Sequence, residues 1–162
     1  MEFQNRKYPR LKQYDYRQPG YYYITIHNER NVPAMSFIKQ HPGERAAVHL
    51  TEEGCVAQEQ LLLLEKRYDY VKVDKIVIKP THIHIILRLL DGMMPRPGLP
   101  EIIGAYKSVT TREINRRKNT PGTRRFQRSF YDTVLRNEKA YQECWVYIDG
   151  NPGKWIVDPE DI

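Results

Sequence analysis

The periodicity of apolar side chains is the feature that most limits what this chain can fold into. Apolar and alternating runs predict strands over 21–27, 70–78, 82–90 and 126–135, and helical spacing predicts helices over 51–67, 99–118 and 137–149. The first six elements follow the βαββαβ order of ferredoxin-like domains, an α+β fold. We therefore expect an antiparallel sheet with helices on one face, its other face free, and a C-terminal helix. Residues 37–50, interrupted by Pro42-Gly43, form either a hairpin or a loop.

The length of 162 residues fits a single domain, which we place at residues 20–162 after a short basic arm at residues 1–19. Hydrophobic residues at 40% and charged residues at 28% exclude a disordered chain. No apolar run approaches the ~20 residues of a membrane helix, and no signal peptide is recognisable. We therefore expect a soluble, cytoplasmic protein. Cys55 and Cys144, far apart, are expected to be reduced core residues.

The positive charge of the chain is concentrated in one segment. The formal net charge is +6, yet residues 103–136 alone hold nine basic and two acidic side chains, or +7, and the remaining residues sum to −1. A solvated helix face is the ordinary explanation for such a run. The near absence of interleaved acids favours contact with phosphates instead.

Two histidines in the strand predicted after Pro80 are candidates for chemistry. Alternation places His82 and His84 on one face and the neighbouring isoleucines on the other. The two imidazoles lie about 7 Å apart along the strand and can converge on one cation. Two protein ligands leave a metal with open positions, unlike a four-ligand structural zinc site. A His-x-His pair alone is more often an ordinary surface or core pair.

The last predicted helix contributes a tyrosine. At ~100° per residue, its apolar stripe contains Tyr141, Cys144, Trp145 and Ile148, and Tyr147 falls beyond its edge by about 60°. A tyrosine at this border is usually an amphipathic rim residue. Asn151, four residues further on, shares the flank of Tyr147 if the helical turn persists.

Several motifs occur together along the chain in a fixed order. They are Arg10–Tyr22, Pro80-x-His82-x-His84, Ile103–Ser108, Phe126–Asp132, Arg136–Lys139 and Tyr147–Trp155. Together they resemble the single-tyrosine HUH transposases, specifically the REP-associated tyrosine transposase branch. The resemblance spans nearly the whole chain.

The resemblance implies a DNA strand transferase that cleaves and rejoins single-stranded, hairpin-containing DNA of the REP type. His82, His84 and Asn151 match the ligands of a divalent cation, Mg²⁺ or Mn²⁺, and Tyr147 matches the nucleophile that forms a 5′-phosphotyrosine. A phenol has a pKa of ~10 and is a poor nucleophile at neutral pH, so it needs a cation that polarises the phosphate. The resemblance also implies a monomer or a homodimer that is located in a prokaryotic cytoplasm and is associated with the nucleoid.

The basic residues then acquire an expected role as contacts along the DNA path beside the sheet. The residues expected to bind DNA are Lys107, Arg112, Arg116, Arg117, Arg124, Arg125 and Arg128, together with Arg10 and Lys12 of the arm.

Two other functions remain open from the sequence. A non-catalytic ferredoxin-like nucleic-acid-binding module, such as a transposase relic, needs the basic segment and the aromatic residues but neither the histidine pair nor Tyr147. A metal hydrolase that uses an activated water would turn over without a tyrosyl adduct, although no Asp or Glu stands beside the histidines on their strand.

Overall fold

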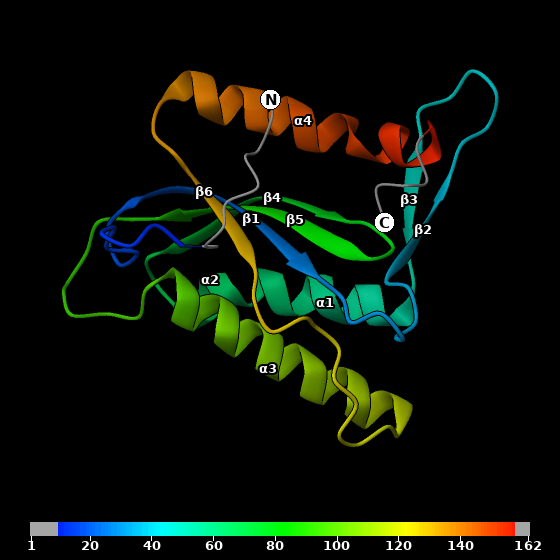
Figure 1. Cartoon of the computed structure of the whole chain (residues 1–162), viewed down its shortest axis with the longest axis horizontal. Helices are drawn as coiled ribbons and strands as arrows, with labels where there is room; N and C mark the ends of the chain where they lie inside the picture. Colours follow the sequence, from blue (N-terminus) through cyan, green and yellow to red (C-terminus); the bar gives the residue numbers. More distant parts are fainter. Residues whose placement is uncertain (1–9, 158–162) are drawn as a thin grey trace.

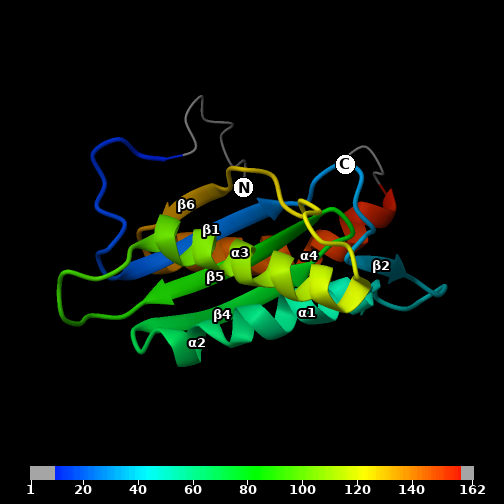
Figure 2. The ribbon, with the colours of Figure 1, turned by 90° about the horizontal axis from the view of Figure 1, so that it is seen from below.

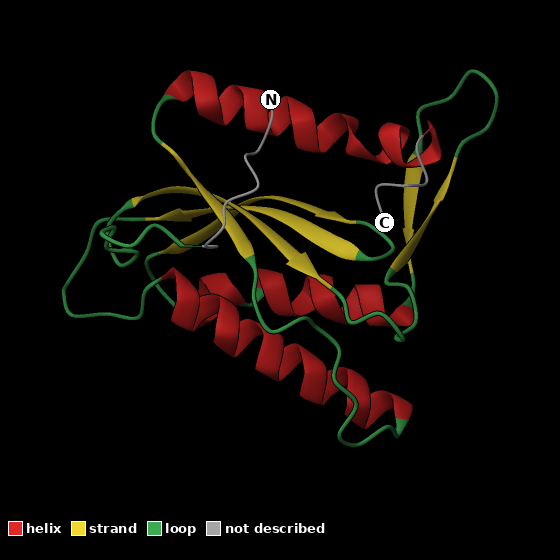
Figure 3. Cartoon of the chain, viewed as in Figure 1, coloured by secondary structure: helices red, strands yellow, loops and turns green. Residues whose placement is uncertain are grey.

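The structure, a computed structural model, describes residues 10–157, with the side chains of residues 10–150. Four strands form one antiparallel sheet (Figures 1 and 3), and their spatial order is β4-β5-β1-β6 (Figure 2). The strands are β1 (Gly20–His27), β4 (Val71–Ile78), β5 (His82–Leu89) and β6 (Tyr131–Leu135). This order, with helices after the first and third of these strands, confirms the predicted α+β class.

Helices cover both faces of the sheet. One layer consists of α1 (Glu52–Leu62), α2 (Leu64–Arg67) and α3 (Leu99–Lys118), and the opposite layer is α4 (Glu138–Val157) (Figures 1 and 2). The expectation that the second sheet face is free was therefore wrong. The apolar stripe of α4 buries Cys144 and Ile148 against Tyr23 and Ile86 of that face.

The larger core lies between the sheet and the layer of α1 and α3. The alternate residues Tyr22, Ile24 and Ile26 of β1 are fully buried there, as the period of two requires. Tyr106 of α3 is completely buried, and its hydroxyl donates a hydrogen bond to the carbonyl of Ala57 in α1, 3.1 Å away. The two helices are thus joined by an apolar contact and by a satisfied buried polar group.

Local signals set the helix ends. Thr51 caps α1, because its side-chain oxygen accepts a hydrogen bond from the backbone N–H of Gly54 at 3.3 Å. α3 begins where the Glu101 carboxylate accepts from the N–H of Gly98 at 3.1 Å. It ends at Lys118 and is followed by its C-cap residue, Asn119, in the left-handed region with φ 52°. These boundaries of α3 match the predicted range of 99–118.

Several elements differ from the sequence-based expectation. Residues 37–50 form a hairpin of their own, β2 (Ser36–Lys39) and β3 (Ala47–Leu50), separate from the main sheet. Strand β6 is shorter than predicted, and α4 continues to Val157 rather than ending near residue 149. Cys55 is exposed on α1, so it is not the core residue that was expected, whereas Cys144 is buried.

The described part of the N-terminal segment, residues 10–19, packs on the domain. Tyr16 is 7% exposed, and its carbonyl accepts from the N–H of Leu99 at the start of α3. The Tyr14 and Tyr22 hydroxyls lie 3.1 Å apart. Within the described residues, none of the helices has both the length and the apolar character needed to cross a bilayer.

Two glycines predict opposite effects of the same substitution. A Cβ at Gly54 would collide with the backbone carbonyl of Met35, so Gly54→Ala should lower the free energy of unfolding by about 1–3 kcal/mol. Gly104, exposed in α3, has open space around it, and Gly104→Ala should raise the free energy by up to about 1 kcal/mol. Urea denaturation of both variants measures the difference, and equal effects would contradict the close approach at Gly54.

Candidate active site

The two histidines of β5 face α4. His82 and His84 are only 6% and 5% exposed, and their ring centroids are 4.7 Å apart at an interplanar angle of 83°. The intervening Ile83 points into the opposite core, as alternation predicts. The structure therefore brings the two imidazoles together in the layer between the sheet and α4.

Hydroxyl groups hold the Nδ1 atoms of both rings. The Nδ1 of His84 lies 2.7 Å from the Tyr23 hydroxyl and 3.2 Å from the Thr25 hydroxyl, and the Nδ1 of His82 lies 3.1 Å from the Thr81 hydroxyl. The Nε2 of His84 is buried without a hydrogen-bond partner among the described residues. When Nδ1 carries the proton of His84, the lone pair of Nε2 is left to bind a cation.

Burial keeps these histidines neutral. Burial, with smaller contributions from Lys79 and His27, lowers the pKa of His82 from 6.5 to about 3. The pKa of His84 is lowered well below its usual value, and burial is the largest cause, followed by the neighbouring His82. Neutral imidazole is the protonation state that coordinates metals, so the pair is ready to accept a cation at neutral pH.

Tyr147 lies beside this pair. Its half-buried ring on α4 is 6.4 Å from the ring of His84 and 6.4 Å from the ring of Tyr23, both in edge-to-face arrangements. The neighbours Cys144 and Ile148 are fully buried and hold this part of α4 on the sheet. The helix and the histidines of one chain therefore assemble the site together.

The third expected ligand, Asn151, falls on α4, but its side chain lies outside the described residues. Within the part of the chain whose side chains are described, no group of three or more His, Cys, Asp or Glu residues has the arrangement of a metal site. A cation at this pair would therefore be held by His82 and His84, and the role of Asn151 remains a prediction.

Sequence reasoning missed three residues that line the site from β1. Antiparallel pairing places Thr25 opposite His84 and His27 opposite His82, with the His27 and His82 ring centroids 5.2 Å apart. Tyr23 contacts both His84 and Tyr147. Tyr22, Ile24 and Ile26 are buried in the larger core, so alternation along β1 places Tyr23, Thr25 and His27 on the face of the histidines.

Much of the basic segment lies in the other layer. α3 packs on the sheet face that is opposite the histidines (Figure 2), so its cations do not continue directly into the site. Arg116 and Arg117 both pair with Glu113, at 2.8 and 2.7 Å, and Lys118 pairs with Glu52 at 2.5 Å. These acidic partners neutralise part of the positive charge that was counted in residues 103–136.

Two further cations serve the fold. Arg125 is 4% exposed and donates to the side chains of Asn115 and Thr120, at 2.8 and 2.7 Å, which closes the turn after α3. Arg10 donates to the buried Asp132 at 3.0 Å. Hydrogen bonds within the folded chain therefore account for the basic side chains of Arg125 and Arg10.

The other predicted cations gather at a groove of about 350 Å³ between α3 and the loop before β6. Arg112 and Arg128 are exposed there, and Lys107 is half-buried and donates to the carbonyls of Gln127 and Arg128. The pKa of Lys107 is lowered, mainly by burial and to a smaller extent by the positive charges of Arg10 and Arg124. Lys12 is exposed in the N-terminal segment, outside this groove.

Comparison with solved structures confirms the fold implied by the resemblance. A REP-associated tyrosine transposase bound to a REP hairpin superposes with a TM-score of 0.59 at 16% identity, over 90% of this chain and 73% of that chain. A candidate transposase from Deinococcus radiodurans R1 superposes with a TM-score of 0.50 at 13% identity, over 87% of this chain and 95% of that one. The chain has the fold of these transposase structures.

Sequence comparison adds one relative. An uncharacterized protein of Haemophilus influenzae (strain Rd) is 26% identical over 172 residues, which cover 95% of this chain and 92% of the relative. No protein-family model matches the chain. The similarity to this relative extends over most of both chains and assigns no reaction.

The buried histidines predict a loss of stability in acid. Between pH 6.5, where a histidine titrates when solvated, and the pKa of His82 near 3, the unfolded chain binds more protons than the folded chain. The free energy of unfolding should therefore fall as the pH decreases below about 6.5, by up to about 1.4 kcal/mol per pH unit for each histidine. Urea denaturation across this range measures the slope. A His82→Gln/His84→Gln variant with an unchanged slope would contradict the assignment.

Proposed function

We propose that the protein is a metal-dependent, single-tyrosine DNA transposase that cleaves and rejoins single-stranded, hairpin-containing DNA. The observation that carries the proposal is the placement of the Tyr147 ring 6.4 Å from His84, whose buried Nε2 lacks a partner among the described residues. The fold shared with the hairpin-bound REP-associated tyrosine transposase supports DNA of this kind as the substrate. A hydrolase that uses an activated water would leave the position of Tyr147 beside His84 unexplained.

In this proposal Tyr147 is the nucleophile. Its phenolic oxygen forms a bond to the scissile phosphorus, the bond from phosphorus to the 3′ oxygen breaks, and the phenolic proton passes to solvent. The products are a 5′-phosphotyrosine and, after protonation of the leaving oxygen, a free 3′-hydroxyl. The ester conserves the phosphodiester energy, so a second 3′-hydroxyl can reverse the reaction and rejoin the strand without ATP.

His82 and His84, with Asn151 as the expected third ligand, would hold the divalent cation. A bound cation would polarise the phosphate and neutralise developing charge. Of the two expected cations, Mn²⁺ suits two imidazoles better than Mg²⁺, which prefers oxygen ligands. Tyr23 and Thr25 hold the ring of His84 through Nδ1, and when this nitrogen carries the proton, the lone pair of Nε2 is left for the metal.

We further propose that the groove at Lys107, Arg112, Arg124 and Arg128 binds the phosphates of the same DNA. Because the groove and the site lie on opposite faces of the sheet, one DNA molecule that reaches both must pass an edge of the sheet. The β6 edge lies nearest the groove and carries Tyr131, which is 48% exposed and packs edge-to-face on His27 with ring centroids 5.7 Å apart.

Removal of the Tyr147 hydroxyl tests the nucleophile. Tyr147→Phe should reduce the covalent protein–DNA adduct to background while DNA affinity stays unchanged, because the ring and its packing remain. Labelled hairpin DNA incubated with Mn²⁺ and resolved on a denaturing gel reports the adduct. Tyr68→Phe, in the other layer, is the matched control. An adduct of wild-type yield in Tyr147→Phe would refute the assignment, and an adduct formed at full rate in EDTA would refute the metal.

Substitutions of the groove cations and of the buried Arg125 should have different effects, the first on DNA binding and the second on stability. Arg112→Ala and Arg128→Ala should each weaken DNA binding across sequences and reduce the salt slope, log K against log[salt], by about 1. Arg125→Ala should instead lower the free energy of unfolding by about 1–3 kcal/mol, since it leaves Asn115 and Thr120 without their donor. Binding titrations at several salt concentrations, with urea denaturation, separate the two. A wild-type salt slope in both groove variants would remove the groove from the proposal.

A further inference from the structure

Three side chains of α4 contact the same two residues of β4. The Tyr141 hydroxyl donates to Asp74 Oδ2 at 3.1 Å, and Lys75 Nζ lies 4.5 Å from the Trp145 ring centroid. The same Nζ donates to Asp149 Oδ1 at 2.9 Å. Tyr141, Trp145 and Asp149 are spaced four residues apart and therefore share one side of the helix.

A β-bulge makes this double contact possible. Val73 pairs with Leu87 and Lys75 pairs with Ile86, so Asp74 is an extra residue in β4. In a regular strand the side chains of Asp74 and Lys75 would point to opposite faces of the sheet. The bulge lets both residues reach α4, and bulges commonly re-aim side chains beside functional sites.

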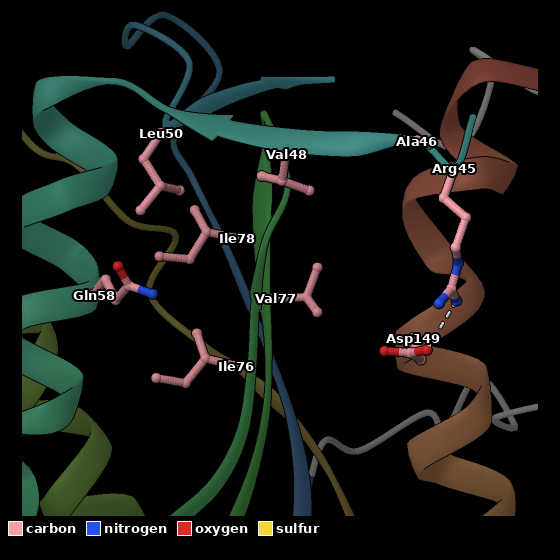
Figure 4. A pocket seen from close by; sticks show the side chains of 9 residues that line it. All are labelled: Arg45, Ala46, Val48, Leu50, Gln58, Ile76, Val77, Ile78 and Asp149. Carbon is pink, nitrogen blue, oxygen red and sulfur yellow. Dashed lines mark hydrogen bonds and ion pairs between the residues drawn. The ribbon is translucent and has the colours of Figure 1, made fainter. Parts of the chain in front are cut away.

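The hairpin contributes a second, weaker hold on the same carboxylate. Arg45, in the turn between β2 and β3, donates to Asp149 Oδ2 at 3.0 Å, as Figure 4 shows at the rim of a cavity of about 440 Å³. The Arg45 side chain is 85% exposed, whereas that of Lys75 is 19% exposed. Exposed ion pairs contribute little, so Lys75 is the stronger partner of Asp149.

These contacts lie on one border of the helix face that packs on the sheet, and Tyr147 lies on the other. At ~100° per residue, Cys144 and Ile148 fall between Trp145 on one side and Tyr147 on the other. The apolar contact of Cys144 and Ile148 is non-directional, so it fixes where α4 lies better than how it is rotated about its axis. A rotation that releases Lys75 would also move Tyr147 relative to His84.

We propose that Lys75 is a positioning residue for Tyr147: its contacts with Asp149 and Trp145 set the rotation of α4 so that the tyrosine faces His84. The inference rests on the proposed function, because it assigns Lys75 a role in forming the tyrosyl adduct. A misplacement of about 1 Å at reacting atoms can cost about a hundredfold in rate, so the loss of this directional contact should be visible in the chemical step.

The test compares the rate of adduct formation at saturating hairpin DNA with the dissociation constant for the same DNA. Lys75→Met keeps an unbranched side chain over Trp145 but removes the ammonium group, and the rate should fall about tenfold or more while affinity is unchanged. The swap Lys75→Asp/Asp149→Lys should recover part of the rate. Lys72→Met, on the same strand but paired with Glu65 of α2 at 3.8 Å, is the matched control and should leave the rate unchanged.

A readout independent of activity separates this inference from the proposed function. The ¹⁹F resonance of 3-fluorotyrosine incorporated at position 147 senses the rings of His84 and Tyr23, and Lys75→Met should move it toward the value of the unfolded chain. If wild type forms no adduct, the proposed function fails and this resonance still decides the positioning role. If Lys75→Met does not fold, the nearly isosteric Asp149→Asn replaces it. An unchanged resonance and an unchanged rate in the folded variant would overturn the inference.

Discussion

Strand β5 is buried on both faces, and the rest of the structure is arranged around that burial. Ile83, Ile85 and Leu87 point into the core formed with α1 and α3, while His82, His84 and Ile86 point toward α4. A strand in this position can carry polar side chains only if the surrounding residues leave them neutral or provide hydrogen-bond partners. The fold meets both conditions, since burial lowers the histidine pKa values and hydroxyl groups engage their Nδ1 atoms.

Patterns local in the sequence predicted the parts of the fold that depend on local physics. The helix at 99–118 was predicted with its observed ends, because its apolar spacing lies within the segment and its capping residues, Gly98 and Asn119, directly flank it. Alternation in β5 likewise placed His82 and His84 on one face. The same rule applied to β1 would have found Tyr23 and Thr25, whose importance becomes clear only when pairing sets Thr25 opposite His84.

The features that the sequence did not predict depend on contacts between distant segments. Nothing near residue 74 indicates a bulge, which is visible only against the register of β5. The charge count could not show that Glu52 neutralises Lys118 or that Glu59 lies 3.3 Å from Arg117, because these partners are far apart in the chain. For the same reason the count could not place the basic helix and the histidines on opposite faces of the sheet.

The cost of the histidine pair bears on the choice between a catalyst and a binding module of the same fold. A buried polar atom without a partner costs about 1–3 kcal/mol relative to a satisfied one, and Nε2 of His84 has no partner among the residues that the structure describes. A purely structural sheet would avoid this cost with an apolar side chain, as Ile86 does two residues along the same face. A cation bound at Nε2 would remove the cost and use the neutral imidazole that burial enforces. This energetic argument, together with the adjacent Tyr147, favours the catalytic proposal over a module that needs only the basic groove.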